Sequence, residues 1–72
     1  MKIVGDHVIY VDPKGVQHNA LVQQVWTETC INLVYVSDNV DEQDSYGRQT
    51  KHVTSIQHQT MMAGVPGNYW KG

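Results

Sequence analysis

The chain has 72 residues, with seven acidic and five basic side chains and a formal net charge of −2. This length fits one domain whose small core buries only about 60% of the surface that the extended chain exposes. The slight acidic excess argues against a general polyanion binder, because phosphate affinity depends mainly on cationic charge. Cys30 is the only cysteine, so no intrachain disulfide can staple the fold, and self-association is the common remedy for such a small core.

Hydropathy and cysteine content predict a soluble protein of a reducing compartment. No apolar run approaches the roughly 20 residues that span a bilayer, and residues 1–6 lack the apolar middle of a signal peptide. A lone cysteine at a strand position most often behaves as a small buried hydrophobe. We therefore expect a cytoplasmic protein with no membrane partner.

The first residues predict a strand followed by a tight turn. Apolar residues within 2–11 surround an interruption at Gly5, which indicates a strand that bends or bulges there. The segment 12–15, Asp-Pro-Lys-Gly, then has the residues of a turn. Aspartate hydrogen-bonds to the following backbone, proline sets φ, and glycine tolerates the left-handed conformation.

Residues 17–38 form the segment around which we expect the chain to be organised. Two runs rich in β-branched and aromatic residues, 20–27 and 30–36, are separated by two residues and predict a tight antiparallel hairpin. Alternation divides the second strand into one face with Ile31, Leu33 and Tyr35 and another with Asn32, Val34 and Val36. Both faces are largely apolar. We expect a curled sheet to cover one face and a partner, ligand or terminal segment to cover the other.

The next part of the chain predicts a loop and two short strands. Residues 38–47 are polar and aperiodic and hold four of the seven carboxylates, which is typical of an exposed loop. We expect a strand over 48–53, a short helical turn at 54–55 and a last brief strand over 56–60.

The C-terminal residues 61–72 predict an irregular tail, since they contain Gly64, Pro66 and Gly67. The tail nevertheless ends in Tyr69 and Trp70. Exposed aromatic rings would form an apolar patch, and such patches usually mark an interface. We expect the tail to dock on the barrel or on a neighbouring subunit, with these two aromatics at an oligomer interface.

Five short strands with evenly spaced turn signals, and no amphipathic helix, predict an all-β fold. The pattern is carried by residues 4–8 (Val-Gly-Asp-His-Val), the hairpin over 20–36 and residues 53–56 (Val-Thr-Ser-Ile). It resembles the SH3-like barrel of SH3, Tudor and KOW-type modules. The resemblance implies a small five-stranded SH3-like barrel over 1–60, followed by the irregular aromatic tail over 61–72.

A second resemblance rests on phrases spread along the chain, at residues 11–15, 18–22, 32–37, 44–49, 54–58 and 69–70. These phrases look like those of a group of small uncharacterised proteins encoded by tailed bacteriophages. The resemblance implies a viral accessory protein that works inside a bacterium, and it brings no established activity with it.

No constellation in the sequence predicts a metal site or a catalytic site. The histidines are His7, His18, His52 and His58. They and Cys30 lack the paired spacings of zinc ligands, and the acidic loop lacks the order of a calcium-binding loop. Ser55 or Cys30, together with His58 and a carboxylate, would match a catalytic triad in composition only, without a nucleophile elbow. We expect no catalytic residue, no metal and no cofactor.

Residues 45–52 are the predicted binding segment. They combine an aromatic ring, a glycine, a guanidinium, an ammonium and an imidazole, a mixture that suits an anionic or planar ligand. An aromatic residue on an adjacent strand would add a stacking platform. The predicted ligand-binding or partner-binding residues are Tyr46, Arg48, Lys51, His52, Tyr35 and Trp26. The alternative is a solvated junction between loop and strand, with Tyr35 and Trp26 at the edge of the core.

These observations predict a non-enzymatic binding module, homo-oligomeric and phage-encoded, that recognises a host or viral protein. One alternative is an oligomeric sponge that sequesters a nucleotide-like signalling molecule, with Arg48, Lys51 and His52 as binding residues. Another is a nucleic-acid-binding protein or a minor virion component, although the charge disfavours nucleic acid.

Overall fold

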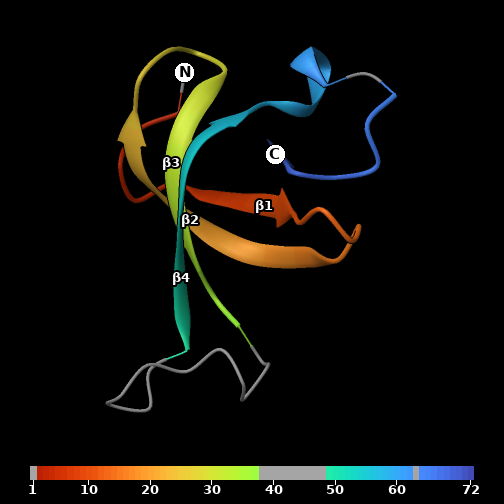
Figure 1. The fold of residues 1–72 in the computed structure, drawn as a ribbon. Coiled ribbons are helices and arrows are strands. Elements are labelled where there is room, and N and C mark those ends of the chain that lie inside the picture. Colours follow the sequence, from red (N-terminus) through yellow and green to blue (C-terminus); the bar gives the residue numbers. More distant parts are fainter. Residues whose placement is uncertain (1, 38–48, 63) are drawn as a thin grey trace.

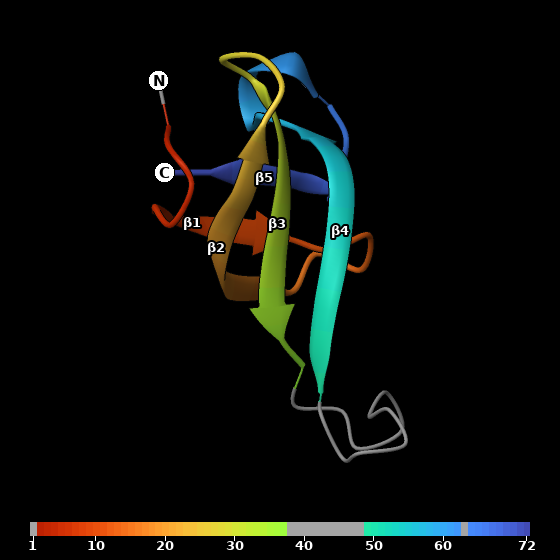
Figure 2. The ribbon, with the colours of Figure 1, turned by 90° about the vertical axis from the view of Figure 1, so that its left-hand side faces the viewer.

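The computed structural model describes residues 2–37, 49–62 and 64–72. Its elements are β1 (His7–Val11), β2 (Gln17–Val25), β3 (Cys30–Val36), β4 (Thr50–Gln57), the 3-10 helix η2 (Gln59–Met61) and β5 (Tyr69–Lys71). The described strands form an antiparallel sheet in the order β4-β3-β2-β1-β5. Figure 1 labels β1 to β4, and Figure 2 also labels β5. The sheet curls into a half-barrel, and an isolated bridge between His58 and Trp70 joins the end of β4 to β5. The predicted all-β fold of five strands is confirmed.

The chain enters β1 through a turn, and the strand begins at His7 instead of Lys2. Asp6 folds back on Ile3, whose backbone N donates to Asp6 Oδ2 at 3.0 Å, while Asp6 N donates to the Ile3 carbonyl. Gly5 adopts a φ of +94°, which lets the chain reverse. These local hydrogen bonds replace the first part of the predicted strand.

The turn at residues 12–15 forms as predicted. Asp12 Oδ1 accepts hydrogen bonds from the backbone N of Lys14 and of Val16, both at 2.9 Å. Gly15 has a φ of +85° and donates to the Asp12 carbonyl. The aspartate therefore satisfies the backbone groups that the turn removes from the sheet.

The central hairpin is also confirmed, with β2 paired to β3 through Leu21 opposite Val34. Its first strand ends at Val25, two residues earlier than predicted. Thr27 Oγ1 accepts from the backbone N of Cys30 at 3.0 Å and so shapes the loop.

The second half of the chain differs from the prediction. One strand, β4, occupies 50–57 where we predicted two strands and a helical turn. At the predicted turn Ser55 is part of a bulge with a φ of +55°, and its backbone N donates to Asn32 Oδ1 at 2.8 Å. Among the described residues, a helical turn comes later, at 59–61, and is capped by His58, whose side chain accepts from the Thr60 backbone N.

The tail is not irregular throughout, because β5 within it pairs with β1. Trp70 lies opposite Tyr10, is 3% exposed and donates from Nε1 to the Thr29 carbonyl at 2.8 Å. It docks on its own barrel, which is the first of the two places predicted for the tail. Tyr69 is half-buried on the same strand. The indole is one of the buried side chains of the hydrophobic core.

The core lies on the inner, concave face of the sheet. Its buried members are Val8, Tyr10, Ala20, Val22, Ile31, Leu33, Ile56 and Trp70. The predicted face with Ile31, Leu33 and Tyr35 is thus the inner one. Among the described residues, no helix is long and apolar enough to cross a bilayer.

Candidate functional site

Aliphatic side chains remain on the outer face of the sheet after the core is filled. Leu21 on β2 is 49% exposed, and Val36 on β3 is 71% exposed. Val34 lies opposite Leu21 and is half-buried. This is the second apolar face of the hairpin, and the described part of the chain does not bury it.

These residues belong to a depression of about 330 Å³, which we call the outer-face hollow. Its lining residues are His7, Asn19, Ala20, Leu21, Val34, Tyr35, Val36 and Thr50. A closed cavity of about 150 Å³ is enough to bind benzene. The outer-face hollow therefore has room for one or two apolar groups of side-chain size.

The rim of the outer-face hollow is polar without lysine, arginine, aspartate or glutamate among its described lining residues. His7 Nε2 and Asn19 Oδ1 are 2.9 Å apart, and beyond the rim His52 Nδ1 lies 3.1 Å from Gln23 Oε1. A charged group placed here would lose water and find no opposite charge among the described lining residues. The geometry suits an uncharged apolar group.

The structure divides the predicted binding residues between two faces. Lys51 lies opposite Tyr35, on the inner face, whereas His52 lies opposite Val34, on the outer face. Trp26 is 58% exposed and donates from Nε1 to Asn32 Oδ1, a side chain of the outer face. Neighbouring residues of a strand point to opposite faces, so Lys51 and His52 cannot share one site.

The two remaining predicted residues, Tyr46 and Arg48, lie outside the described residues. Of the described members of the predicted set, Tyr35 alone is among the lining residues of the outer-face hollow, although its ring packs against Tyr10 and His18 on the inner face. The other lining residues were missed, although the sequence carried one signal for them, namely the second apolar face of the strand 30–36.

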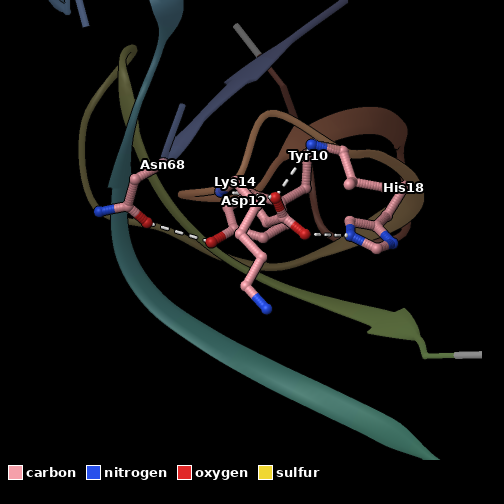
Figure 3. Close-up of polar contacts among 6 residues, drawn as sticks. Tyr10, Asp12, Lys14, His18 and Asn68 are labelled. Carbon is pink, nitrogen blue, oxygen red and sulfur yellow. Dashed lines mark hydrogen bonds and ion pairs between the residues drawn. The ribbon is translucent and has the colours of Figure 1, made fainter. Parts of the chain in front are cut away.

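A second group of polar and aromatic side chains lies around Tyr10 and His18 (Figure 3). The ring centroids of His18 and Tyr35 are 4.3 Å apart, and those of Tyr10 and Tyr35 are 5.3 Å apart. His18 Nε2 lies 2.9 Å from Asp12 Oδ2, and the Tyr10 hydroxyl donates to Asn68 Oδ1 at 3.0 Å. Sequence reasoning missed this cluster. The signal in the sequence was the turn at 12–15, because it joins β1 to β2 in a register that places residues 10 and 18 opposite each other.

The charges in this cluster are consistent with a structural role. The hydrogen bond from His18 lowers the pKa of Asp12, with help from the backbone N–H groups of Val16 and Lys14 and against a smaller effect of burial. Burial raises the pKa of Tyr10, as do the nearby Tyr35 and Asp12. Asp12 is therefore ionised at neutral pH while Tyr10 keeps its proton for Asn68. Both groups stabilise their neighbours.

A third feature is a polar depression of about 460 Å³ beside the hairpin loop, lined by Lys2, Asp6, Glu28, Thr29, His58, Trp70 and Gly72. Its side chains carry charges of both signs, and exposed pairs of this kind contribute little binding energy in water. No group of three or more potential metal ligands occurs among the described residues. The outer-face hollow is the stronger candidate because its apolar surface gains directly from burial.

The chain matches no protein-family model, no curated protein sequence and no solved structure.

Proposed function

We propose that this protein is a non-enzymatic binding module that holds a protein partner on the outer-face hollow. The observation that carries the proposal is the exposure of Leu21 and Val36 beside Val34 on an open sheet face. A 72-residue chain has few aliphatic side chains available for its core. Leaving three of them outside costs stability unless a partner covers them, since burial contributes about 25 cal/mol per Å². The resemblance to phage proteins makes a host or viral protein the expected partner.

The distribution of charge favours a protein partner over a nucleotide. A nucleotide sponge built on Lys51 and His52 needs both side chains on one face, and they point to opposite faces. The outer-face hollow has no lysine or arginine among its described lining residues to hold a phosphate. An uncharged apolar segment of a protein fits it better.

Site-specific photo-crosslinking tests the proposal. A photoreactive amino acid replaces Val36 in one variant and Met61 in the other, in cells that produce the protein. Met61 is a matched control, since it is 61% exposed and apolar but lies on η2. We expect a discrete protein adduct from position 36 alone. Adding Leu21→Asp to the position-36 variant should abolish the adduct.

Equal adducts at both positions, or no adduct at position 36, would contradict the proposal. Thermal melting of the Leu21→Asp variant shows whether its loss of crosslinking reflects binding. Leu21 is half exposed, so the folded state should persist. An adduct of twice the mass of the chain would identify a second copy as the partner.

A further inference from the structure

The outer edge of β4 has no neighbouring strand in the described sheet. β4 is the end strand of the described sheet, with β3 on one side, and the bridge to Trp70 is made by His58, just after β4 ends. Figure 2 shows β3 and β4 extending together beyond β5 toward the Thr50 end. The bulge at Ser55 limits the straight part of this edge to residues 50–53. A straight, unpaired edge is where an extended chain can add to a sheet.

The hydrogen-bond pattern shows which backbone groups this edge presents. Ser37 N donates to the Gln49 carbonyl at 2.7 Å, so these two residues form a hydrogen-bonded pair. From there the register runs without a shift as far as residue 53. Hydrogen-bonded and non-hydrogen-bonded pairs alternate in antiparallel sheets. Thr50 and His52 therefore turn their N–H and C=O groups away from β3, to the open edge.

The same two residues point their side chains to the face that holds the outer-face hollow. Thr50 lines the hollow, and His52 lies opposite Val34. In an antiparallel strand added at this edge, the residues opposite Thr50 and His52 would point to that face as well. The added strand would lie about 9.5 Å from β3, two strand spacings away. A leucine or aromatic side chain opposite the small Thr50 would reach toward the hollow.

The size of the outer-face hollow favours a short segment over a folded surface. Among the described residues, eight line it. A stable interface between folded proteins uses roughly 20–30 residues on each side. An extended segment needs less area, because its main-chain hydrogen bonds add to the burial of one or two side chains.

We propose that the partner presents an extended segment that adds as a strand to the outer edge of β4 at Thr50 and His52, and that this segment places an uncharged apolar side chain over the outer-face hollow. The inference rests on the proposed docking at the hollow and adds to it the conformation of the partner. The segment pairs antiparallel over about four residues and carries its apolar residue opposite Thr50.

The experiment selects a random short-peptide library by mRNA display against the full chain. We expect enriched peptides that share one apolar position and bind Val36→Asp at least about tenfold more weakly. N-methylation of the peptide amides that face β4 should weaken binding by a similar factor, whereas methylation of the intervening amides should have little effect. In the complex, hydrogen exchange of the Thr50 and His52 amides should slow at least about tenfold.

Thr50→Pro removes one N–H of the edge, so it should also weaken binding. It keeps an uncharged side chain at position 50 of the hollow, so the apolar contact should change little. The N-methylated peptides need no protein variant and decide the question even if Thr50→Pro is unstable. Peptides that depend on Val36 but tolerate every N-methyl group and Thr50→Pro would overturn strand addition and leave docking at the hollow intact. Peptides indifferent to Val36→Asp would contradict both proposals.

The absence of any enriched peptide would overturn the inference, and crosslinking at position 36 would still test the proposed function separately. Sedimentation of the protein alone tests whether a second copy of this chain occupies the edge of β4. A dimer whose Thr50 and His52 amides are already protected would show that a second copy fills the edge, which also overturns the inference.

Discussion

Trp70→Ala tests the docking of the C-terminal strand on its own barrel. The indole is 3% exposed, its Nε1 donates to the Thr29 carbonyl at 2.8 Å, and its ring centroid lies 4.5 Å from that of His58. Truncating a buried tryptophan to alanine costs about 3–5 kcal/mol. A small domain often has only about 5 kcal/mol of stability in total. We expect the variant to be largely unfolded at room temperature or to lose more than about 12 °C in Tm.

Urea denaturation followed by circular dichroism measures this loss as a free energy of unfolding. The matched control is Trp26→Ala, which removes an indole that is 58% exposed and has one hydrogen bond, to Asn32. That substitution should cost about 1 kcal/mol or less. If both variants lose the same stability, the indole of Trp70 is not in the core and the assignment of β5 fails.

Trp70→Phe separates packing from hydrogen bonding. The phenyl ring keeps most of the apolar contact and loses the N–H donor. The Thr29 carbonyl still accepts a hydrogen bond from the His58 backbone N at 2.8 Å, so no buried acceptor is left unpaired. The hydrogen bond should then account for only about 1 kcal/mol. A loss as large as that of Trp70→Ala would contradict this division.

Three further predictions concern the turn, the tail and the outer-face hollow. His18 lowers the pKa of Asp12 below its ordinary 3.8, so the ionised form stabilises the fold. This contribution is complete above about pH 5 and is lost as the pH falls through the folded-state pKa of Asp12. Between pH 6 and pH 2.5, the Tm of Asp12→Asn should therefore fall less than the Tm of the unsubstituted protein. Urea denaturation should show a larger loss of unfolding free energy for Gly67→Ala than for Gly64→Ala. A Cβ at position 67 would overlap the Asp12 carbonyl, whereas a Cβ at position 64 would meet no atom and would be disfavoured only by the backbone φ of +81°. Val36→Asp should change the free energy of unfolding by about 1 kcal/mol or less, since Val36 is 71% exposed; a larger loss in thermal melting would place it in the core.

The features predicted correctly from the sequence depend on residues close together in the chain. The turn at 12–15 forms because Asp12 and Gly15 supply their own hydrogen bonds and backbone conformation. The hairpin joins two runs with high strand propensity across a short loop. Neither feature requires knowledge of distant partners, so the local pattern was enough.

The errors concern segments whose partners lie far away in the chain. Ser55 adopts its left-handed conformation because Asn32, 23 residues earlier, accepts a hydrogen bond from its backbone N. Trp70 becomes a core residue because β5 pairs with β1, about 60 residues earlier. The glycines and proline before Tyr69 indicated an irregular tail, and long-range pairing overrode that local signal.

The candidate site shows the same division. The sequence showed that the strand 30–36 is apolar on both faces, and alternation required Lys51 and His52 to point in opposite directions. It did not show which face would become the core. Ile31 and Leu33 are buried in the same core cluster as Trp70, on the inner face of the curled sheet, whereas Val36 remains exposed.

The amino-acid sequence by itself determined the first three strands, the turn at 12–15 and the two-sided apolar character of the hairpin, because these follow from backbone preferences and side-chain alternation over a few residues. Only the tertiary structure decided which apolar face is enclosed and which remains available to a partner. That choice depends on the direction in which the sheet curls and on an indole brought from the other end of the chain, and both are set by contacts between residues far apart in sequence.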